Sequence, residues 1–252
     1  MSWDSEQYLK FKKERQQPCL DLLSRLDGDY KHILDLGCGP GNSTVNLEVY
    51  FPKAEIIGFD SDENMLKRAK AEHQNFCFIQ GFAPQDFSKL NNKFDLVFSN
   101  ACIHWIPDQS GLIASINAIL KDSGTFAVQI PIAAESKFYK LLYGLIENKW
   151  SKLKSVSKFH MLDQDGYYNE LIKHFSEVTI WRTDYYHLID SKNMVIEWYK
   201  GSGLRPYLSA LDEKEQKEFI ADLSEIIEKE YHPLDDGQLF LIMPRLFFIA
   251  KK

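Results

Sequence analysis

The stretch "HILDLGCGPGNST", residues 32–44, is the part of the sequence that most constrains the fold. An apolar run of strand length leads into three closely spaced glycines, Gly37, Gly39 and Gly41, and then into polar residues. Glycine permits positive φ angles and lets a ligand approach the backbone closely. A strand, a glycine-rich turn and a helix in this order form the ligand-binding unit of open α/β sheets. The stretch therefore predicts such a sheet, with a ligand site at the end of its first strand.

The spacing of the glycines indicates which ligand the turn binds. A dinucleotide fingerprint, G-x-G-x-x-G, needs its third glycine at position 42, where Asn42 stands, and the third glycine is instead Gly41. The carboxylate of Asp35 suits a ligand with a cationic amine better than a pyrophosphate. Asp60 ends the next apolar run and can accept both hydroxyls of a ribose. This combination is similar to that of S-adenosylmethionine-dependent methyltransferases of the Rossmann-like class.

Strand-like and helix-like segments alternate through the first half of the chain. Near-continuous apolar strands separated by helices predict a parallel sheet with helices on both faces. Ser61 and Asp108 are expected as helix N-caps. The expected strands are 32–36, 55–60, 75–79, 94–99 and 125–130.

The second half of the chain is less regular, and Pro244 predicts a bulge or an interruption in its last strand. Helices are expected at 136–148, 165–174, 191–200 and 212–230, and strands at 178–182 and 239–250. Segments 131–160 and 183–235 are too long for simple connections. We therefore expect one methyltransferase domain over 1–252, with an N-terminal lid helix in 1–30 and substrate-lid insertions at 131–160 and 183–235.

Composition and charge exclude several classes of protein. A formal net charge of −6 argues against a nucleic-acid partner, and the apolar runs are too short to span a bilayer. The start of the chain lacks the pattern of a secretory signal, so a cytoplasmic location is expected. The four cysteines form no C-x-x-C pair, so no metal site is predicted. The sequence does not indicate an oligomeric state.

Segments along the whole chain resemble the trans-aconitate methyltransferases. The segments that carry this resemblance are "YLKFKKERQQPCLDLL", "DLGCGPGNST", "GFDSDENML", "NACIHWIPD", "AVQIP", "WRTDYYH", "GLRPYL" and "MPRLFFIAKK". The resemblance implies an α/β Rossmann-like class I fold, with a seven-stranded, mostly parallel sheet whose last strand is antiparallel. It also implies S-adenosylmethionine as cofactor, and methyl transfer to a carboxylate of a small polycarboxylic acid, first of all trans-aconitate.

The resemblance also implies cofactor contacts, residue by residue. The glycines would line the methionine and ribose, Asp60 would bind the ribose, and Met65 would pack near the adenine. Phe82 stands where the family usually has an acidic residue that meets the adenine amino group. A backbone contact from Phe82, or an acceptor from Gln80 or Asp86, could replace that contact. The expected cofactor-binding residues are Asp35, Gly37, Gly39, Gly41, Asp60, Ser61, Met65, Phe82 and Asn100.

Substrate contacts follow from the chemistry of a polyanion. Arginine is favoured over lysine because its planar guanidinium binds carboxylates through two hydrogen bonds. A carboxylate acceptor is already ionised at neutral pH, so no catalytic base is required. We therefore expect His104 to donate a hydrogen bond to substrate. The candidate substrate-binding residues are Tyr8, His104, Trp105, Arg182, Tyr186, His187, Arg205 and Arg245.

Two alternatives stay open at this point. One is a carboxyl methyltransferase for another acid, such as a carrier-bound malonyl group or a long-chain acid. "HWI" at 104–106 also resembles the juvenile hormone acid methyltransferases. The other is a non-catalytic cofactor-binding protein. The candidate arginines argue against a mostly apolar acid, and the intact glycine turn with Asp60 argues against a non-catalytic protein.

Overall fold

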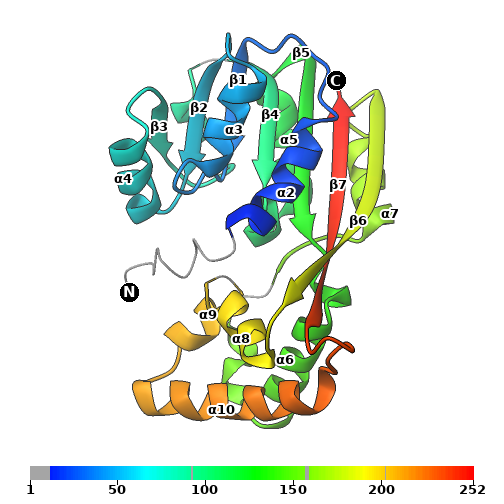
Figure 1. Cartoon of the computed structure of the whole chain (residues 1–252). Coiled ribbons are helices and arrows are strands. Elements are labelled where there is room, and N and C mark those ends of the chain that lie inside the picture. The colour runs from blue at the N-terminus through cyan, green and yellow to red at the C-terminus, as the bar shows by residue number, and fades with distance from the viewer. Residues whose placement is uncertain (1–11, 92, 157–158, 202) are drawn as a thin grey trace. The chain divides into compact units, whose positions relative to one another are not determined.

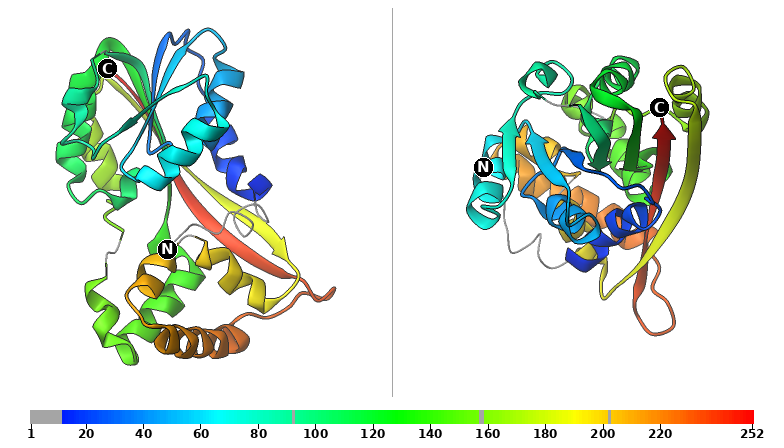
Figure 2. Two further views of the ribbon diagram at one scale, coloured as in Figure 1. Left: turned by 90° about the vertical axis from the view of Figure 1, so that its left-hand side faces the viewer. Right: turned by 90° about the horizontal axis from the view of Figure 1, so that it is seen from above.

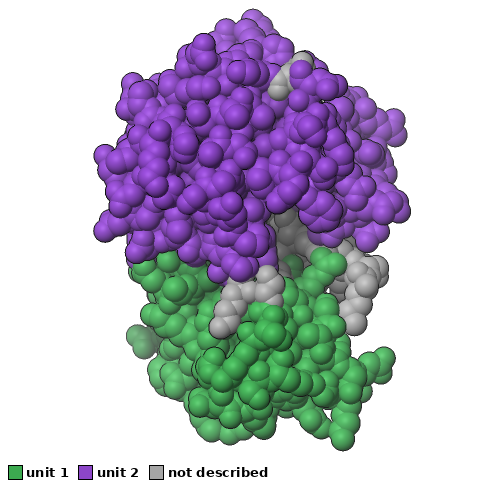
Figure 3. All heavy atoms as spheres, turned by 180° about the vertical axis from the view of Figure 1, so that it is seen from behind, with its two compact units in different colours: residues 1–15, 132–158, 184–244 green, residues 16–131, 159–183, 245–252 purple. Residues whose placement is uncertain are grey.

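The computed structural model describes residues 12–91, 93–156, 159–201 and 203–252. The chain forms two compact units, which Figure 3 shows in different colours. Unit 2 contains Gln16–Pro131, Phe159–Thr183 and Arg245–Lys252. Most of unit 1 consists of 132–156 and 184–244. The two segments of unit 1 have nearly the same bounds as the expected lid insertions at 131–160 and 183–235. Their role as a lid stays a prediction.

A seven-stranded sheet organises unit 2, and its two longest strands continue into unit 1 (Figure 1). The strand order is β3-β2-β1-β4-β5-β7-β6. The strands are β1 (His32–Leu36), β2 (Glu55–Asp60), β3 (Cys77–Gln80), β4 (Phe94–Asn100), β5 (Leu120–Pro131), β6 (Glu177–Ile189) and β7 (Leu239–Lys251). β1 to β5 pair in parallel, and β7 pairs antiparallel to β5. The predicted sheet, with its antiparallel last strand, is confirmed.

The strand order changes direction between β1 and β4. The chain runs outward from β1 to β2 and β3, then returns to the other side of β1 with β4. In open α/β sheets, ligands bind outside the carboxyl ends of the strands at such a reversal. The fold therefore places a binding site next to the residues that follow β1, β2 and β4.

Helices cover both faces of the sheet in unit 2 (Figure 2). On one face, Phe126 of β5 and Phe248 of β7 pack edge to face with their ring centroids 5.3 Å apart, and Tyr167 of α7 contacts Phe248. On the other face, Trp181 stacks on Phe247, and the Arg25 guanidinium lies 4.2 Å from the Trp181 ring. The helices of this unit are α2 (Lys12–Leu23), α3 (Asn42–Tyr50), α4 (Glu63–Glu72), α5 (Gln109–Ile119) and α7 (Gln164–Leu171), with short 3-10 turns η1 (Phe87–Lys89) and η2 (Ile103–Trp105).

Unit 1 is mainly helical, and aromatic side chains form much of its core. The rings of Phe138 and Tyr199 stack with their centroids 3.6 Å apart. Asp212 and Glu215 form a reciprocal capping box that starts the longest helix. The elements are η3 (Ala133–Glu135), α6 (Lys137–Asn148), η4 (Ser151–Ser155), α8 (Lys192–Lys200), α9 (Arg205–Ser209) and α10 (Glu213–Glu230).

Two local expectations were wrong. Asp62, and not Ser61, caps α4, because its carboxylate accepts hydrogen bonds from the backbone N–H groups of Asn64 and Met65. β7 runs through Pro244 without an interruption. The residues of β7 that pair with β5 begin at Arg245, one residue after Pro244, so the missing N–H of Pro244 lies outside that ladder. The Pro244 carbonyl accepts a hydrogen bond from the backbone N–H of Ile132.

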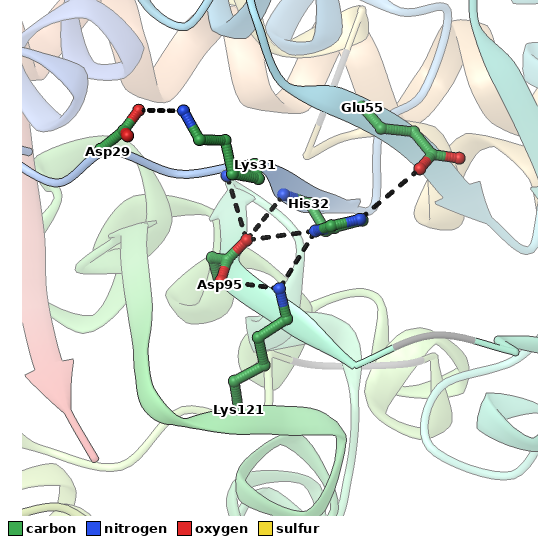
Figure 4. A network of polar contacts seen from close by, with 6 residues as sticks. All are labelled: Asp29, Lys31, His32, Glu55, Asp95 and Lys121. Carbon is green, nitrogen blue, oxygen red and sulfur yellow. Dashed lines mark hydrogen bonds and ion pairs between the residues drawn. The ribbon is translucent and has the colours of Figure 1, made fainter.

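A polar network joins four strands at the amino ends of β1, β2, β4 and β5 (Figure 4). The Asp95 carboxylate accepts hydrogen bonds from the backbone N–H groups of Lys31, at 3.0 Å, and His32, at 2.8 Å. Lys121 Nζ lies 2.9 Å from Asp95 Oδ1. Because this edge is opposite to the carboxyl ends of the strands, the network holds the sheet together away from the predicted site.

Candidate active site

The glycine turn after β1 requires glycine for two physical reasons. Gly37, Gly39 and Gly41 have φ angles of 76°, 54° and 91°, a region that other residues rarely adopt. A Cβ atom on Gly37 would also lie 2.2 Å from the Cys102 sulfur. The Gly37 N–H donates to the carbonyl of Phe59 at 2.7 Å, which fixes the turn against β2. The turn therefore has half-buried backbone without side chains at Gly37 and Gly39, in conformations that other residues rarely adopt.

Asp35 lies beneath this turn and is completely buried. Its Oδ2 accepts hydrogen bonds from the hydroxyls of Ser43, at 2.8 Å, and Thr44, at 2.6 Å, in the first turn of α3. Its Oδ1 has no hydrogen-bond partner within the described part of the chain. Burial raises the pKa of Asp35 to about 6. One carboxylate oxygen is thus fixed by the protein, and the other remains available to a ligand.

Asp60, at the end of β2, connects the turn to the next helix. Its Oδ2 accepts a hydrogen bond from Gly39 N at 2.8 Å, and its Oδ1 accepts one from Asp62 N at 2.8 Å. Burial raises the pKa of Asp60 above its ordinary value. Each carboxylate oxygen has a second lone pair, so both can still accept hydrogen bonds from a diol.

Three further predicted cofactor contacts, Ser61, Met65 and Phe82, follow β2 and β3 in the chain. Met65 is half-buried, Ser61 is exposed, and Phe82 is 64% exposed. The backbone N–H of Phe82 donates to Asp86 Oδ2 at 2.9 Å, and its carbonyl accepts from Asp86 N at 2.8 Å. Asp86 thus fixes the backbone of Phe82 in the local turn. The exposed ring and the second lone pair of the Phe82 carbonyl are the parts that can meet an adenine.

The segment after β4 turns sharply and places a histidine. Ala101 has a φ of 55°, which is unusual for a non-glycine residue, and its N–H donates to the Gln129 carbonyl at 2.8 Å. His104 follows in η2 and is 2% exposed. Its ring contacts Phe159 and Trp105, with centroids 4.7 and 5.2 Å away. Burial, together with the charge of Arg245, lowers the pKa of His104 to about 3, so its ring is neutral.

A buried glutamine holds η2 in place. Gln109 Nε2 donates to the carbonyls of Ile103, at 2.8 Å, and Ile106, at 2.6 Å. Its Oε1 accepts a hydrogen bond from the Tyr167 hydroxyl at 2.9 Å. The turn that carries His104 is therefore fixed by two hydrogen bonds from the Gln109 side chain, which the Tyr167 hydroxyl holds in turn.

The structure brings part of the predicted substrate set together. Arg245 lies opposite Pro131 in the β5–β7 ladder, and its charge acts on His104. Arg182, in β6, also belongs to unit 2. Trp105, in η2, belongs to unit 2 as well, whereas Tyr186, His187 and Arg205 belong to unit 1. Tyr8 lies outside the described residues.

Several residues of this site were not predicted from the sequence. Ser43 and Thr44 orient Asp35, Gln109 fixes η2, and Gln129 is a buried polar residue beside Asn100. Each is a polar residue within or beside an apolar segment, which is the only signal that the sequence offers. That signal is weak, because buried polar residues are common wherever the backbone provides partners.

Comparison with known proteins agrees with this geometry. A family model described as a methyltransferase domain matches residues 27–193. A trans-aconitate 2-methyltransferase from Agrobacterium fabrum is 35% identical over an alignment of 259 residues, which covers 100% of this chain and 100% of the relative. One from Sinorhizobium fredii is 34% identical over 261 residues, covering 100% of this chain and 99% of the relative. The chain belongs to the trans-aconitate 2-methyltransferase family.

Solved structures support the fold of this family member. A Bacillus halodurans protein, described as a candidate methyltransferase, has a TM-score of 0.61 and is 16% identical. The likeness covers 93% of this chain and 98% of that protein. In the described part of this methyltransferase, no helix is long and apolar enough to cross a membrane. Within the same residues, no group of three or more His, Cys, Asp or Glu side chains could hold a metal ion.

Proposed function

We propose that the chain transfers the methyl group of S-adenosylmethionine to a carboxylate of trans-aconitate and forms a monomethyl ester. The observation that carries this proposal is the similarity over the whole length to proteins named trans-aconitate 2-methyltransferase. Relatedness over both units matters because the candidate substrate arginines lie in both. A likeness confined to the glycine turn would support the reaction class without the substrate.

The residues after β1 and β2 fit S-adenosylmethionine. The free Oδ1 of Asp35 can accept a hydrogen bond from a cationic amine, and the bare backbone at Gly39 allows close approach. Asp60 can accept hydrogen bonds from both ribose hydroxyls. When bound, S-adenosylmethionine supplies an electrophilic methyl group on a sulfonium ion. The chain's own residues then have to bind, orient and shield the two reactants.

The acceptor needs no proton removed. Carboxylates have pKa values near 4 in water, so the attacking oxygen is ionised at neutral pH. His104, with its pKa lowered to about 3, is a weak base and suits a neutral role, as a hydrogen-bond donor or as a wall of the site. Catalysis then depends on aligning oxygen, methyl carbon and sulfur, which is an effect of proximity and orientation.

Arginine side chains supply the local positive charge that a trianion requires. The net charge of −6 repels a polyanion at long range, so its attraction has to be local. Arg245 lies in unit 2 beside the His104 turn, and Arg182 and Arg205 are further candidates. Each can bind a carboxylate through two parallel hydrogen bonds.

A direct assay tests this proposal. The purified chain is incubated with S-adenosylmethionine and, separately, with trans-aconitate, cis-aconitate, isocitrate, citrate, a malonyl thioester and a long-chain fatty acid. Mass spectrometry then detects any methyl ester. We expect a monomethyl ester from trans-aconitate at the highest rate. An ester from the malonyl thioester or the fatty acid alone would replace the substrate assignment, whereas cofactor binding without any ester would indicate a non-catalytic protein.

A further inference from the structure

Four polar side chains form a row across one face of the sheet in unit 2. The register pairs Asp35 of β1 with Phe98 of β4, and Asn100 of β4 with Gln129 of β5. Arg245 of β7 is opposite Pro131, two residues beyond Gln129. Alternate residues of a strand point to the same face. Asp35, Asn100, Gln129 and Arg245 therefore lie on one face, in this order across four neighbouring strands.

The charges of this row match the two reactants. Asp35, at the β1 end, carries a carboxylate, and Arg245, at the β7 end, carries a guanidinium. Asn100 and Gln129, between them, are neutral. A cationic methyl donor bound beside Asp35 and an anionic acceptor bound toward Arg245 would meet above this neutral pair. The row thus has the polarity that transfer from a sulfonium to a carboxylate requires.

Gln129 is buried without the partners that such a side chain normally has. It is 1% exposed, and its Nε2 has no hydrogen-bond partner among the described residues. The Asn100 Oδ1 and His104 Nδ1 atoms are also buried without a partner there. Buried polar groups are rarely left unpaired, because nothing then offsets the loss of their hydration. Three such atoms around one turn point to a ligand that completes their hydrogen bonds.

Gln109 shows what a structural glutamine looks like in this protein. It is also buried, at 4% exposed, but its amide hydrogen-bonds to two carbonyls and to the Tyr167 hydroxyl. Gln129 has the same side chain and a similar burial without such partners. The contrast separates a glutamine that holds the fold from one that is available to a ligand.

We propose that the side-chain amide of Gln129 donates a hydrogen bond to the substrate carboxylate that accepts the methyl group, an inference that rests on the function proposed above. Gln129 pairs with Asn100, on the β4–β5 side of the reversal in strand order and away from Asp35 on β1. As a donor without charge, it can hold the attacking carboxylate without lowering its nucleophilicity as strongly as an arginine would. Arg245, at the β7 end of the row, is the candidate for another carboxylate of the same polyanion.

The variant that tests this inference is Gln129→Met, which keeps the length of the side chain and removes its donor. We expect the KM for trans-aconitate to rise by roughly 10- to 150-fold, the range for a hydrogen bond to a charged group. The affinity for S-adenosylhomocysteine, measured by calorimetry, should stay unchanged. The melting temperature should stay equal or increase, because no hydrogen bond within the described protein is lost. Gln109→Met should instead lower the melting temperature.

Thr125→Val serves as the matched control for activity. Thr125 is a buried polar residue on the same strand and face as Gln129, four residues before it, and its variant should keep the KM of the wild type. If Gln129→Met keeps the KM of the wild type, or binds S-adenosylhomocysteine more weakly, the role of Gln129 is overturned. Either result leaves the proposed function standing. A wild-type protein that binds S-adenosylhomocysteine but esterifies no acid would overturn the proposed function, and this inference with it.

Discussion

Asp60 Oδ2 accepts a hydrogen bond from the backbone N–H of Gly39 at 2.8 Å. This bond joins the carboxyl end of β2 to the glycine turn that follows β1. The same carboxylate accepts from Asp62 N, so it also fixes the start of α4. One side chain therefore orients three segments of the proposed cofactor site and keeps lone pairs for the ribose.

Replacing this carboxylate should weaken cofactor binding. Asp60→Asn keeps the size of the side chain but replaces one acceptor oxygen with an NH2 donor. This donor would face the N–H of Gly39 or of Asp62, so one of these two hydrogen bonds is lost. Each lost hydrogen bond is worth about 0.5–1.5 kcal/mol. We expect at least a tenfold loss of S-adenosylhomocysteine affinity by calorimetry. Glu63→Gln, an acid-to-amide change at the exposed start of α4, should bind normally. Normal binding by a folded Asp60→Asn protein would refute the role of Asp60.

The pH dependence of turnover should be flat. The substrate carboxylates are ionised throughout pH 6.5 to 9, and His104, with a pKa lowered to about 3, does not change its protonation in that range. We expect kcat to vary little between about pH 6.5 and 9, and His104→Gln to keep much of the activity. A steep rise in kcat with an apparent pKa near 7, absent from His104→Gln, would identify His104 as a general base instead.

Asp95 should make a pH-dependent contribution to stability. Burial raises its pKa, but hydrogen bonds from Lys121 and from the backbone of His32 and Lys31 outweigh burial and hold the pKa at about 2, below the unfolded value of 3.8. A carboxyl with a lowered pKa stabilises the fold above pH 3.8, and this contribution is lost as the pH falls through 2.

Asp95→Asn should therefore lower the free energy of unfolding by about 1–2 kcal/mol at pH 7, after discounting for its partial exposure. The difference from the wild type should shrink below pH 3.8. Urea unfolding at pH 7 and at a pH below 3.8 measures the loss of stability and its dependence on pH. Asp29→Asn, whose side chain is 83% exposed, should change stability by no more than about 0.5 kcal/mol at either pH. Equal losses for Asp95→Asn at both pH values would show that its charge is not the cause.

Arg245→Ala should affect the substrate and not the cofactor. A charge-assisted hydrogen bond to a carboxylate is worth about 1.5–3 kcal/mol, so the KM for trans-aconitate should rise by roughly 10- to 150-fold. Binding of S-adenosylhomocysteine should be unchanged. Arg68→Ala, which removes an arginine paired with Glu72 on α4, should leave the KM unchanged. Equal KM values for the two variants would leave Arg245 without a role in substrate binding.

The sequence predicted those features that depend on neighbouring residues. The apolar runs at His32–Leu36 and Glu55–Asp60 became strands with these bounds. α10, expected at 212–230, spans Glu213–Glu230, because its acidic cap and apolar period are local signals. The strand at 125–130 was predicted too short. It begins at Leu120, which pairs with Phe94 of β4, and the charged and small residues at 121–124 hide this start from a search for apolar runs.

The sequence by itself determined the sheet, the glycine turn and the acidic residues at the ends of β1 and β2. Their patterns arise within a few residues, from near-continuous apolar runs of strand length and from the steric freedom of glycine. Only the tertiary structure decided that Ser43 and Thr44 hold one oxygen of Asp35, and that Gln109 is satisfied while Gln129 is not. Whether a buried polar atom has a partner depends on residues far away in the chain, so a local pattern cannot reveal it.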